Sequence, residues 1–353
     1  MTEVRGVPAD LAGRGIVLIG AGRMGLAHGR ALATLGVPLT AVCDSRPEAL
    51  ERAARELALG PEVARFGDPD RLFDTLRAPG LVVVATTADV HCEMVCRAAR
   101  ARADVLLCEK PMATSVEDCD RILSACADSG TRLAVNHQMR FMPQYTTIQE
   151  ELRSGRFGAL ASMNVVAGCF GVAMNGSHYV EAFRFLTDSP PRSVTAWFSP
   201  EKLPNPRGAR FLDQAGELRV VSEAGQRLHL EIGSDQGHGM TVTYATRWGH
   251  IFVDELAGEY VATARQAEAR SEPVTRYGMP WDRWRASFPP PDNVAPTAAV
   301  MAALLAGEGY PSGEDGRAVC AVLAAAYLSA SEGNREVAVA DIGDFATRRF
   351  PWA

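Results

Sequence analysis

The chain has 353 residues, 47% of them hydrophobic and 22% charged, with a formal net charge of -6. This length predicts two domains with cores of their own, and the composition is that of an ordinary globular protein. Acidic and basic residues are interleaved without an arginine-rich block, which argues against nucleic acid and anionic membranes as partners. No apolar run approaches membrane length, and the N-terminus lacks a signal-type apolar core.

The eight cysteines are scattered through apolar stretches, and Cys92 and Cys96 lie one helical turn apart. No second cysteine or histidine pair at zinc spacing accompanies them, so we predict buried free thiols and no metal site. A reducing, cytoplasmic location is therefore expected.

Short apolar runs alternate with amphipathic stretches over about the first 135 residues. The apolar runs predict strands over residues 15–20, 39–44, 81–86, 104–109 and 132–136. Helical periodicity between them predicts helices over residues 23–35, 46–58, 89–101 and 115–128. Because the strands are apolar almost throughout, both sheet faces must be covered, which predicts a doubly wound parallel α/β domain.

The pattern changes after residue 140, which predicts a domain of residues 1–138 and another of residues 139–353. Helices are predicted over residues 142–154, 177–187, 294–306 and 313–331, and a strand over residues 160–168. Residues 194–265 alternate as antiparallel strands do, with a turn at Ala224-Gly225. The proline- and aromatic-rich residues 276–293 predict a loop, either a pocket rim or a linker.

A glycine-rich turn joins the first predicted strand to the first helix. It consists of Gly20, Gly22, Arg23, Met24 and Gly25. Such glycines permit a tight turn, close approach of the backbone to a pyrophosphate, and close packing of helix on strand. The helix N-terminus would face the phosphates, so the turn predicts a dinucleotide-binding (Rossmann) domain.

Asp44 ends the second predicted strand, where a carboxylate binds the adenosine ribose hydroxyls of a dinucleotide. A carboxylate there would repel a 2′-phosphate, which favours NAD over NADP. Arg46 has two interpretations, since it can accommodate a 2′-phosphate or simply be a solvated arginine at a helix start.

Lysine is rare in this chain: Lys110 and Lys202 are the only two among 36 basic residues. Lys110 follows a buried strand and lies between Glu109 and Pro111. A partly buried lysine can lose its proton, whereas arginine cannot. Desolvation and a cationic nicotinamide would both lower its pKa, so we predict proton transfer at Lys110. The alternative is an exposed surface lysine.

With Glu109-Lys110-Pro111 after a strand, the glycine turn, "ATTADVH" (85–91) and "NHQMRFMPQY" (136–145), the chain resembles the Gfo/Idh/MocA oxidoreductase family. The resemblance covers nearly the whole length. It implies a Rossmann domain, a second α/β domain with an open, mainly antiparallel sheet, and a homo-oligomer, either dimer or tetramer.

The resemblance also implies hydride transfer between NAD and a secondary alcohol of a sugar, amino sugar, nucleotide sugar or cyclitol. Lys110 would match the active-site lysine, and Glu109 would lie near the nicotinamide ribose. The strand-end turn implies cofactor contacts for Thr86, Thr87 and His91. Two alternatives remain: NAD-recycling glycoside cleavage or epimerisation on the same fold, and a non-catalytic dinucleotide-binding regulator.

A second catalytic segment matches "MNGSHYVE" (174–181). His178 is the natural second proton carrier because its ordinary pKa lies near neutrality, and Glu181 sits one turn on. The resemblance implies an aspartate where Met174 stands, and Asn175 can hydrogen-bond nearby but cannot ionise. A capping or core histidine is the alternative for His178.

Several other side chains have two interpretations. Arg140 could contact substrate or form a salt bridge at a helix start. Trp281 and Trp284 could stack on a sugar face or pack within their loop. His28 shows no partner spacing, and we expect it to be structural.

Overall fold

The structure, a computed structural model, describes residues 13–168, 171–203, 205, 207–237, 239–273 and 277–352. The chain forms two compact units. The first consists of Met1–Phe141, Asp292–Cys320 and Ala346–Ala353, and the second of Met142–Pro291 and Ala321–Phe345. The first break lies close to the expected boundary at 138/139, but residues 292–320 and 346–353 return to the first unit. A role of the second domain in substrate binding and oligomerisation stays a prediction.

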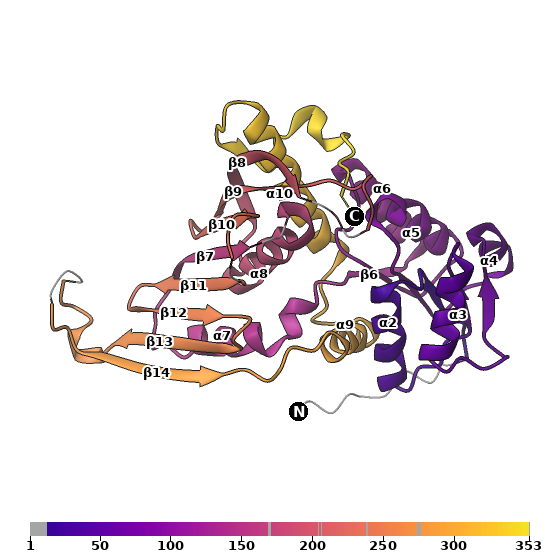
Figure 1. The fold of residues 1–353 in the computed structure, drawn as a ribbon, viewed down its shortest axis with the longest axis horizontal. Helices are drawn as coiled ribbons and strands as arrows, with labels where there is room; N and C mark the ends of the chain where they lie inside the picture. The colour runs from indigo at the N-terminus through magenta and orange to yellow at the C-terminus, as the bar shows by residue number, and fades with distance from the viewer. Residues whose placement is uncertain are drawn as a thin grey trace. The chain divides into compact units, whose positions relative to one another are not determined.

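The first unit contains a parallel six-stranded sheet in the order β3-β2-β1-β4-β5-β6. Figure 1 labels its last strand, β6, and the helices of this unit. The strands are β1 (Ile16–Ile19), β2 (Ala41–Cys43), β3 (Ala64–Phe66), β4 (Leu81–Val84), β5 (Val105–Cys108) and β6 (Arg132–Val135). This order, with neighbours on both sides of β1, is that of the Rossmann fold. The predicted doubly wound domain is therefore confirmed.

Helices cover both faces of this sheet. They are α2 (Arg23–Thr34), α3 (Pro47–Glu56), α4 (Pro69–Thr75), α5 (His91–Arg100), α6 (Val116–Ser129) and α9 (Val294–Ala306). One apolar core joins the sheet to α2, α3 and α9, and the other joins it to α4, α5 and α6. Burial on both faces explains why the strands read as continuous apolar runs.

The sequence pattern did not predict β3 and α4. β3 is a three-residue edge strand whose side chains are exposed or half-buried, so it has no apolar run. α4 has seven residues and begins at Pro69. Its N-cap is Asp68, whose side chain accepts the N–H of Asp70 at 2.9 Å. A proline at the first position and an aspartate cap are ordinary start signals, but the helix is too short for periodicity to show.

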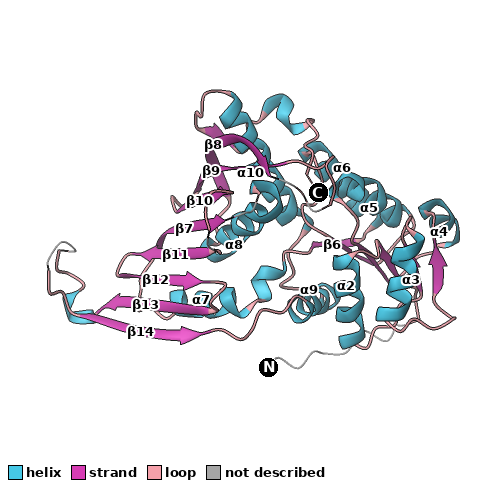
Figure 2. Cartoon of the chain, viewed as in Figure 1, coloured by secondary structure: helices cyan, strands magenta, loops and turns pink. Residues whose placement is uncertain are grey.

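The second unit contains a nine-stranded sheet in the order β14-β13-β12-β11-β7-β10-β9-β8-β15 (Figure 2). The strands are β7 (Leu160–Gly168), β8 (Pro191–Leu203), β9 (Asp213–Ser222), β10 (Arg227–Gly233), β11 (Thr241–Thr246), β12 (Gly249–Asp254), β13 (Glu259–Arg265), β14 (Trp281–Ser287) and β15 (Val337–Ala338). In the part of this sheet that the structure describes, β10 and β7 are the only parallel neighbours, and the other strand pairs are antiparallel. The predicted mainly antiparallel sheet is therefore confirmed, with its turn at Ala224-Gly225 between β9 and β10.

Helices α7 (Pro143–Arg153) and α8 (Ser177–Thr187) belong to the second unit, and α10 (Gly313–Ser331) runs through both. Among the described residues, no helix combines the length and apolar character that crossing a membrane requires. The described cysteines are free and buried, as expected; Cys169 lies outside the described residues.

The prediction of a loop over residues 276–293 is wrong for its middle part. Trp281–Ser287 forms the edge strand β14, paired antiparallel with β13. Its side chains are mostly exposed, so the sequence lacks the apolar alternation that is typical of a strand. Hydrogen bonding to β13 therefore determines its conformation. Trp284 packs near Phe157, with ring centroids 5.7 Å apart, and Arg156 lies over its ring.

Candidate functional site

The carboxyl ends of the central parallel strands are level with one another. Ile19 pairs with Val84, Val84 with Cys108, and Cys108 with Val135. The residues that follow, among them Gly20, Thr86, Glu109 and Asn136, therefore lie along one edge of the sheet. In open α/β sheets this is the edge where ligands bind.

The glycine turn lies at this edge and could not be built from other residues. Gly20 has a φ of +95°, and a Cβ there would lie 2.6 Å from the carbonyl of Ala85. A Cβ on Gly25 would lie 2.0 Å from the Gly20 carbonyl oxygen. Gly22 is the N-cap of α2 and has no side-chain acceptor for the first-turn N–H groups, which suits them to an anionic ligand. Arg23 is exposed and Met24 half-buried at the start of α2.

Asp44 follows β2 and is buried beside the glycine turn. Its Oδ2 accepts the Ala21 N–H at 2.8 Å, and the Arg46 guanidinium donates to both of its oxygens at 3.1 Å. Burial by itself would raise the pKa of Asp44, yet hydrogen bonds from Arg46 and Ala21 hold it below its ordinary value. The residues present thus fit a dinucleotide, because a carboxylate able to accept from ribose hydroxyls lies next to a helix start suited to a phosphate.

His91 begins α5, as expected, and is fully buried. Its Nδ1 lies 3.0 Å from the Pro111 carbonyl oxygen, and its Nε2 lies 3.2 Å from the Thr86 carbonyl oxygen. The imidazole therefore links the turn after β4, which also contains Thr87, to the segment after β5. Cofactor contacts of Thr86, Thr87 and His91 stay predictions.

Glu109 is held by side chains from distant parts of the first unit. Its Oε1 lies 2.7 Å from His28 Nε2 and accepts from Asn136 Nδ2 at 2.8 Å. Burial by itself would raise the pKa of Glu109, but His28, Asn136 and Lys110 together lower it well below its ordinary value. An ionised carboxylate requires the proton of His28 to sit on Nε2.

The contact between His28 and Glu109 is one that the sequence pattern did not predict. The sequence predicts a structural role for His28, because no partner lies at helical or strand spacing from it. Its partner Glu109 is 81 residues away along the chain, and the contact depends on how α2 packs against the parallel sheet. No local pattern signals such a pair.

Lys110 is buried, with 8% of its surface exposed, so the alternative of an exposed surface lysine is wrong. Its backbone N–H donates to Glu109 Oε2 at 3.2 Å, and the peptide bond to Pro111 is cis. The lysine therefore follows β5 at the ligand-binding edge with an ionised carboxylate as its chain neighbour.

Arg140 belongs to the first unit and forms an ion pair with Asp315 at 2.6 Å. Both side chains are largely buried, and Asp315 Oδ2 also accepts the Ser312 N–H at 2.9 Å. The salt-bridge interpretation of Arg140 is thus confirmed, and a substrate contact stays a prediction.

In the second unit, His178 is the second residue of α8 and is half-buried. Glu181 is fully buried and accepts from Arg184 Nε at 2.9 Å, so its charge is balanced within α8. Met174 and Asn175 lie in a π-helix, Val172–Gly176 (η3), that runs directly into α8.

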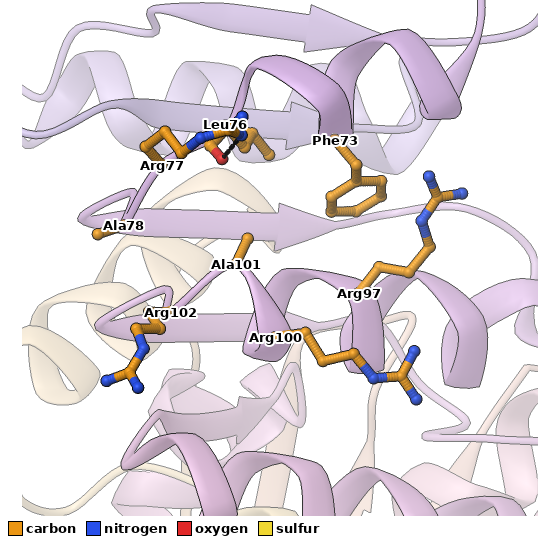
Figure 3. Close-up of a pocket in the computed structure, with 8 residues that line it drawn as sticks. All are labelled: Phe73, Leu76, Arg77, Ala78, Arg97, Arg100, Ala101 and Arg102. Atoms are coloured by element: carbon orange, nitrogen blue, oxygen red, sulfur yellow. Dashed lines mark hydrogen bonds between the residues drawn. The ribbon is translucent and has the colours of Figure 1, made fainter.

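A groove of about 620 Å³ in the first unit is lined by none of the predicted site residues (Figure 3). Its lining residues are Phe73, Leu76, Arg77, Ala78, Arg97, Arg100, Ala101 and Arg102. Ala78 precedes β4 and Arg102 precedes β5, so the groove lies at the amino ends of these strands. This is the edge opposite the glycine turn, and the groove is not the expected dinucleotide site.

Known proteins give independent information on this chain. Residues 14–137 match a family model described as "Oxidoreductase family, NAD-binding Rossmann fold". An inositol 2-dehydrogenase from Streptomyces avermitilis is 30% identical over 318 residues, which cover 77% of this chain and 89% of the relative. A second one, from Acidothermus cellulolyticus, is 34% identical over 198 residues. That match covers 51% of this chain and 55% of the relative, so the chain spans about half of the relative's length.

The fold is shared with solved structures at lower identity. A levoglucosan dehydrogenase in complex with NADH superposes with a TM-score of 0.75 at 19% identity, covering 92% of this chain and 99% of that one. At this identity the likeness concerns the fold alone. From the sequence match over most of the Streptomyces relative, together with the family model and the fold, the chain belongs to the Gfo/Idh/MocA oxidoreductase family.

Proposed function

We propose that this protein is an NAD-dependent dehydrogenase or reductase that acts on a secondary alcohol of a sugar-like molecule. The observation that carries the proposal is the buried Lys110 beside an ionised Glu109, on the sheet edge that also holds the glycine turn. A buried, titratable amine at a dinucleotide-binding edge is suited to proton transfer.

Cofactor binding would rest on two groups of the first unit. The N–H groups at the start of α2 would bind the pyrophosphate, and Asp44 would accept hydrogen bonds from the adenosine ribose. Because Arg46 now donates to both Asp44 oxygens, it must turn aside as ribose hydroxyls take its place. When bound, the nicotinamide supplies the acceptor or donor of hydride.

Lys110 would handle the hydroxyl proton. In alcohol oxidation its neutral amine accepts this proton as the hydride leaves the carbon, and in reduction its ammonium returns it. Burial disfavours the ammonium form and so favours the neutral amine that oxidation needs, while the Glu109 carboxylate favours the ammonium. A buried amine beside a carboxylate is suited to exchanging a proton with the substrate hydroxyl.

In the second unit we propose that His178 is the second proton carrier, with Asn175 and Glu181 contributing to recognition of neighbouring hydroxyls. Arg140 of the first unit would assist in substrate binding. The names of the relatives support a sugar-like substrate, since they are inositol 2-dehydrogenases and a levoglucosan dehydrogenase. A polyol with several adjacent hydroxyls suits a set of polar side chains of this kind.

The test is formation of NADH, followed by its absorbance, with NAD and a panel of cyclitols, hexoses, anhydrosugars, amino sugars and nucleotide sugars. The proposal expects turnover with at least one class, and faster turnover with NAD than with NADP. Tight NADH binding without turnover on any of them would contradict it and favour a dinucleotide-binding regulator. Product formation without accumulation of NADH would point instead to a cofactor-recycling reaction.

A further inference from the structure

The helix that carries His178 starts irregularly. Residues Val172–Gly176 form a π-helix, a conformation that is rare and concentrated at functional sites. The N–H groups of Asn175 and Gly176 both point to the Gly171 carbonyl, at 3.0 and 3.3 Å. The start of the π-helix is therefore closed on a single residue, Gly171.

Asp213, the first residue of β9, is buried against this start. Its Oδ1 accepts the Ala173 N–H at 2.9 Å, and its Oδ2 accepts the Met174 N–H at 2.7 Å. Oδ1 also accepts the N–H of Gln214 at 2.9 Å. The carboxylate thus satisfies two N–H groups that the first turn of a helix leaves without carbonyl partners, and its charge complements the helix dipole.

The close approach of Asp213 depends on a glycine. A Cβ on Gly171 would lie 2.1 Å from Asp213 Cγ, so no other residue fits at this position without movement of the carboxylate. At the other end of the π-helix, a Cβ on Gly176 would lie 3.0 Å from Leu230 Cδ2 of β10. The segment is therefore held between β9 and β10 by packing as well as by hydrogen bonds.

We propose that Asp213 is a positioning residue for His178. We call the two hydrogen bonds that Asp213 accepts from the Ala173 and Met174 N–H groups the clamp. Met174 lies about one helical turn before His178, so the clamp determines where the first turn of α8 begins and which way His178 faces. The Asp213 carboxylate therefore binds the backbone N–H of residue 174, where the side chain is a methionine and cannot ionise. This inference rests on the proposed function, in which His178 carries a proton.

The physical reason for an effect on turnover is geometric. Without the carboxylate, two N–H groups at the start of the helix lose their acceptors in a buried setting, and the π-helical start is free to shift to another register. A displacement of His178 by about 1 Å lowers a rate by about 100-fold. The residues proposed to bind the dinucleotide, the glycine turn and Asp44, lie outside this segment, so we expect the Kd for NADH to be unchanged.

The experiment compares Asp213→Ala and Asp213→Asn with a matched control, Asp254→Ala. Asp254 lies in the same unit and also accepts a backbone N–H, from Ala257 at 2.9 Å, but in the turn between β12 and β13. We expect Asp213→Ala to lower kcat by about 100-fold with an unchanged Kd for NADH. Asp213→Asn keeps the volume and one acceptor oxygen and should recover part of the activity, while Asp254→Ala should behave as wild type.

A second readout keeps the inference testable apart from the reaction. Hydrogen–deuterium exchange of peptides spanning residues 171–178 should accelerate in both Asp213 variants and not in Asp254→Ala. If the wild type shows no turnover with any substrate, the proposed function fails, and faster exchange would still support the clamp. Asp213→Asn with wild-type kcat, or with unchanged exchange over residues 171–178, would overturn the inference.

Discussion

The segment after β5 and the segment before α8 hold the side chains proposed for proton transfer in different ways. After β5, side chains hold side chains: Glu109 is bound by His28 and Asn136, next to Lys110. Before α8, a side chain holds the main chain: Asp213 binds the N–H groups of residues 173 and 174. The first arrangement controls the charge of the site, and the second controls where the helix begins.

This difference would allow residue 174 to depart from the aspartate that the resemblance implies while Glu109-Lys110 follows the implied pattern. A buried ionised carboxylate needs specific donors, so Glu109 and its partners tolerate little change. A helix start needs only an acceptor near its first N–H groups, and that acceptor can come from another strand. Residue 174 can therefore be methionine while a carboxylate still acts on the same turn.

The largest effect should come from Lys110→Ala. Loss of the proton-transfer group is expected to lower kcat by about 100- to 10,000-fold, measured as NADH formation, with little change in NADH binding. Lys110→Arg should be equally inactive because a guanidinium keeps its proton. The matched control is Lys202→Ala, the only other lysine of the chain, which should be fully active. An active Lys110→Arg would show that only the positive charge matters.

Glu109→Gln removes the negative charge from the segment after β5. Replacing a carboxylate that accepts from His28 and Asn136 should lower the free energy of unfolding by about 2 kcal/mol at neutral pH, measured by urea denaturation. The exposed Glu117→Gln is the control and should be unchanged.

The same variant makes a pH prediction. The pKa of Glu109 is lowered in the folded state, so the unfolded state binds more protons, and the stabilisation is present above the unfolded pKa of about 4.3 and lost as pH falls below it. Wild type should therefore lose stability more steeply than Glu109→Gln on acidification. Parallel loss in the two proteins would contradict the lowered pKa.

A smaller effect is expected at the cofactor-binding edge. Asp44→Ala should raise the Kd for NAD by about tenfold and reduce the preference for NAD over NADP, because the ribose acceptor and its repulsion of a 2′-phosphate are both lost. Arg46→Ala is the companion variant: it removes the guanidinium but keeps the carboxylate, so NAD should bind at least as well as in wild type. Weaker NAD binding in Arg46→Ala alone would show that the arginine, not Asp44, recognises the ribose.

The smallest expected effect concerns the segment before α8. Met174→Asp places a carboxylate about one turn before His178 and should favour the protonated imidazole, measured by NMR titration with His178→Gln to assign the signal. Met174→Asn is the uncharged control and should leave the pKa of His178 unchanged. An identical titration in both variants would mean that the side chain at 174 does not face His178.

The sequence by itself determined much of this protein, because periodicity and turn chemistry act between near neighbours in the chain. The apolar runs located β1, β2, β4, β5 and β6, and the glycine turn and Glu109-Lys110-Pro111 indicated the family. Elements without such local signals, the edge strands β3 and β14 and the short helix α4, were missed because pairing or capping decides them.

Only the tertiary structure decided which distant groups support the reactive ones. His28 meets Glu109 because α2 packs over the parallel sheet, and Asp213 meets residues 173 and 174 because β9 starts beside the π-helix. Both contacts join residues that are far apart in the chain, and strand order and register bring them together. No spacing in the sequence encodes such a contact. The partners of Glu109 and the hydrogen bonds from residues 173 and 174 to Asp213 could therefore be identified only in the structure.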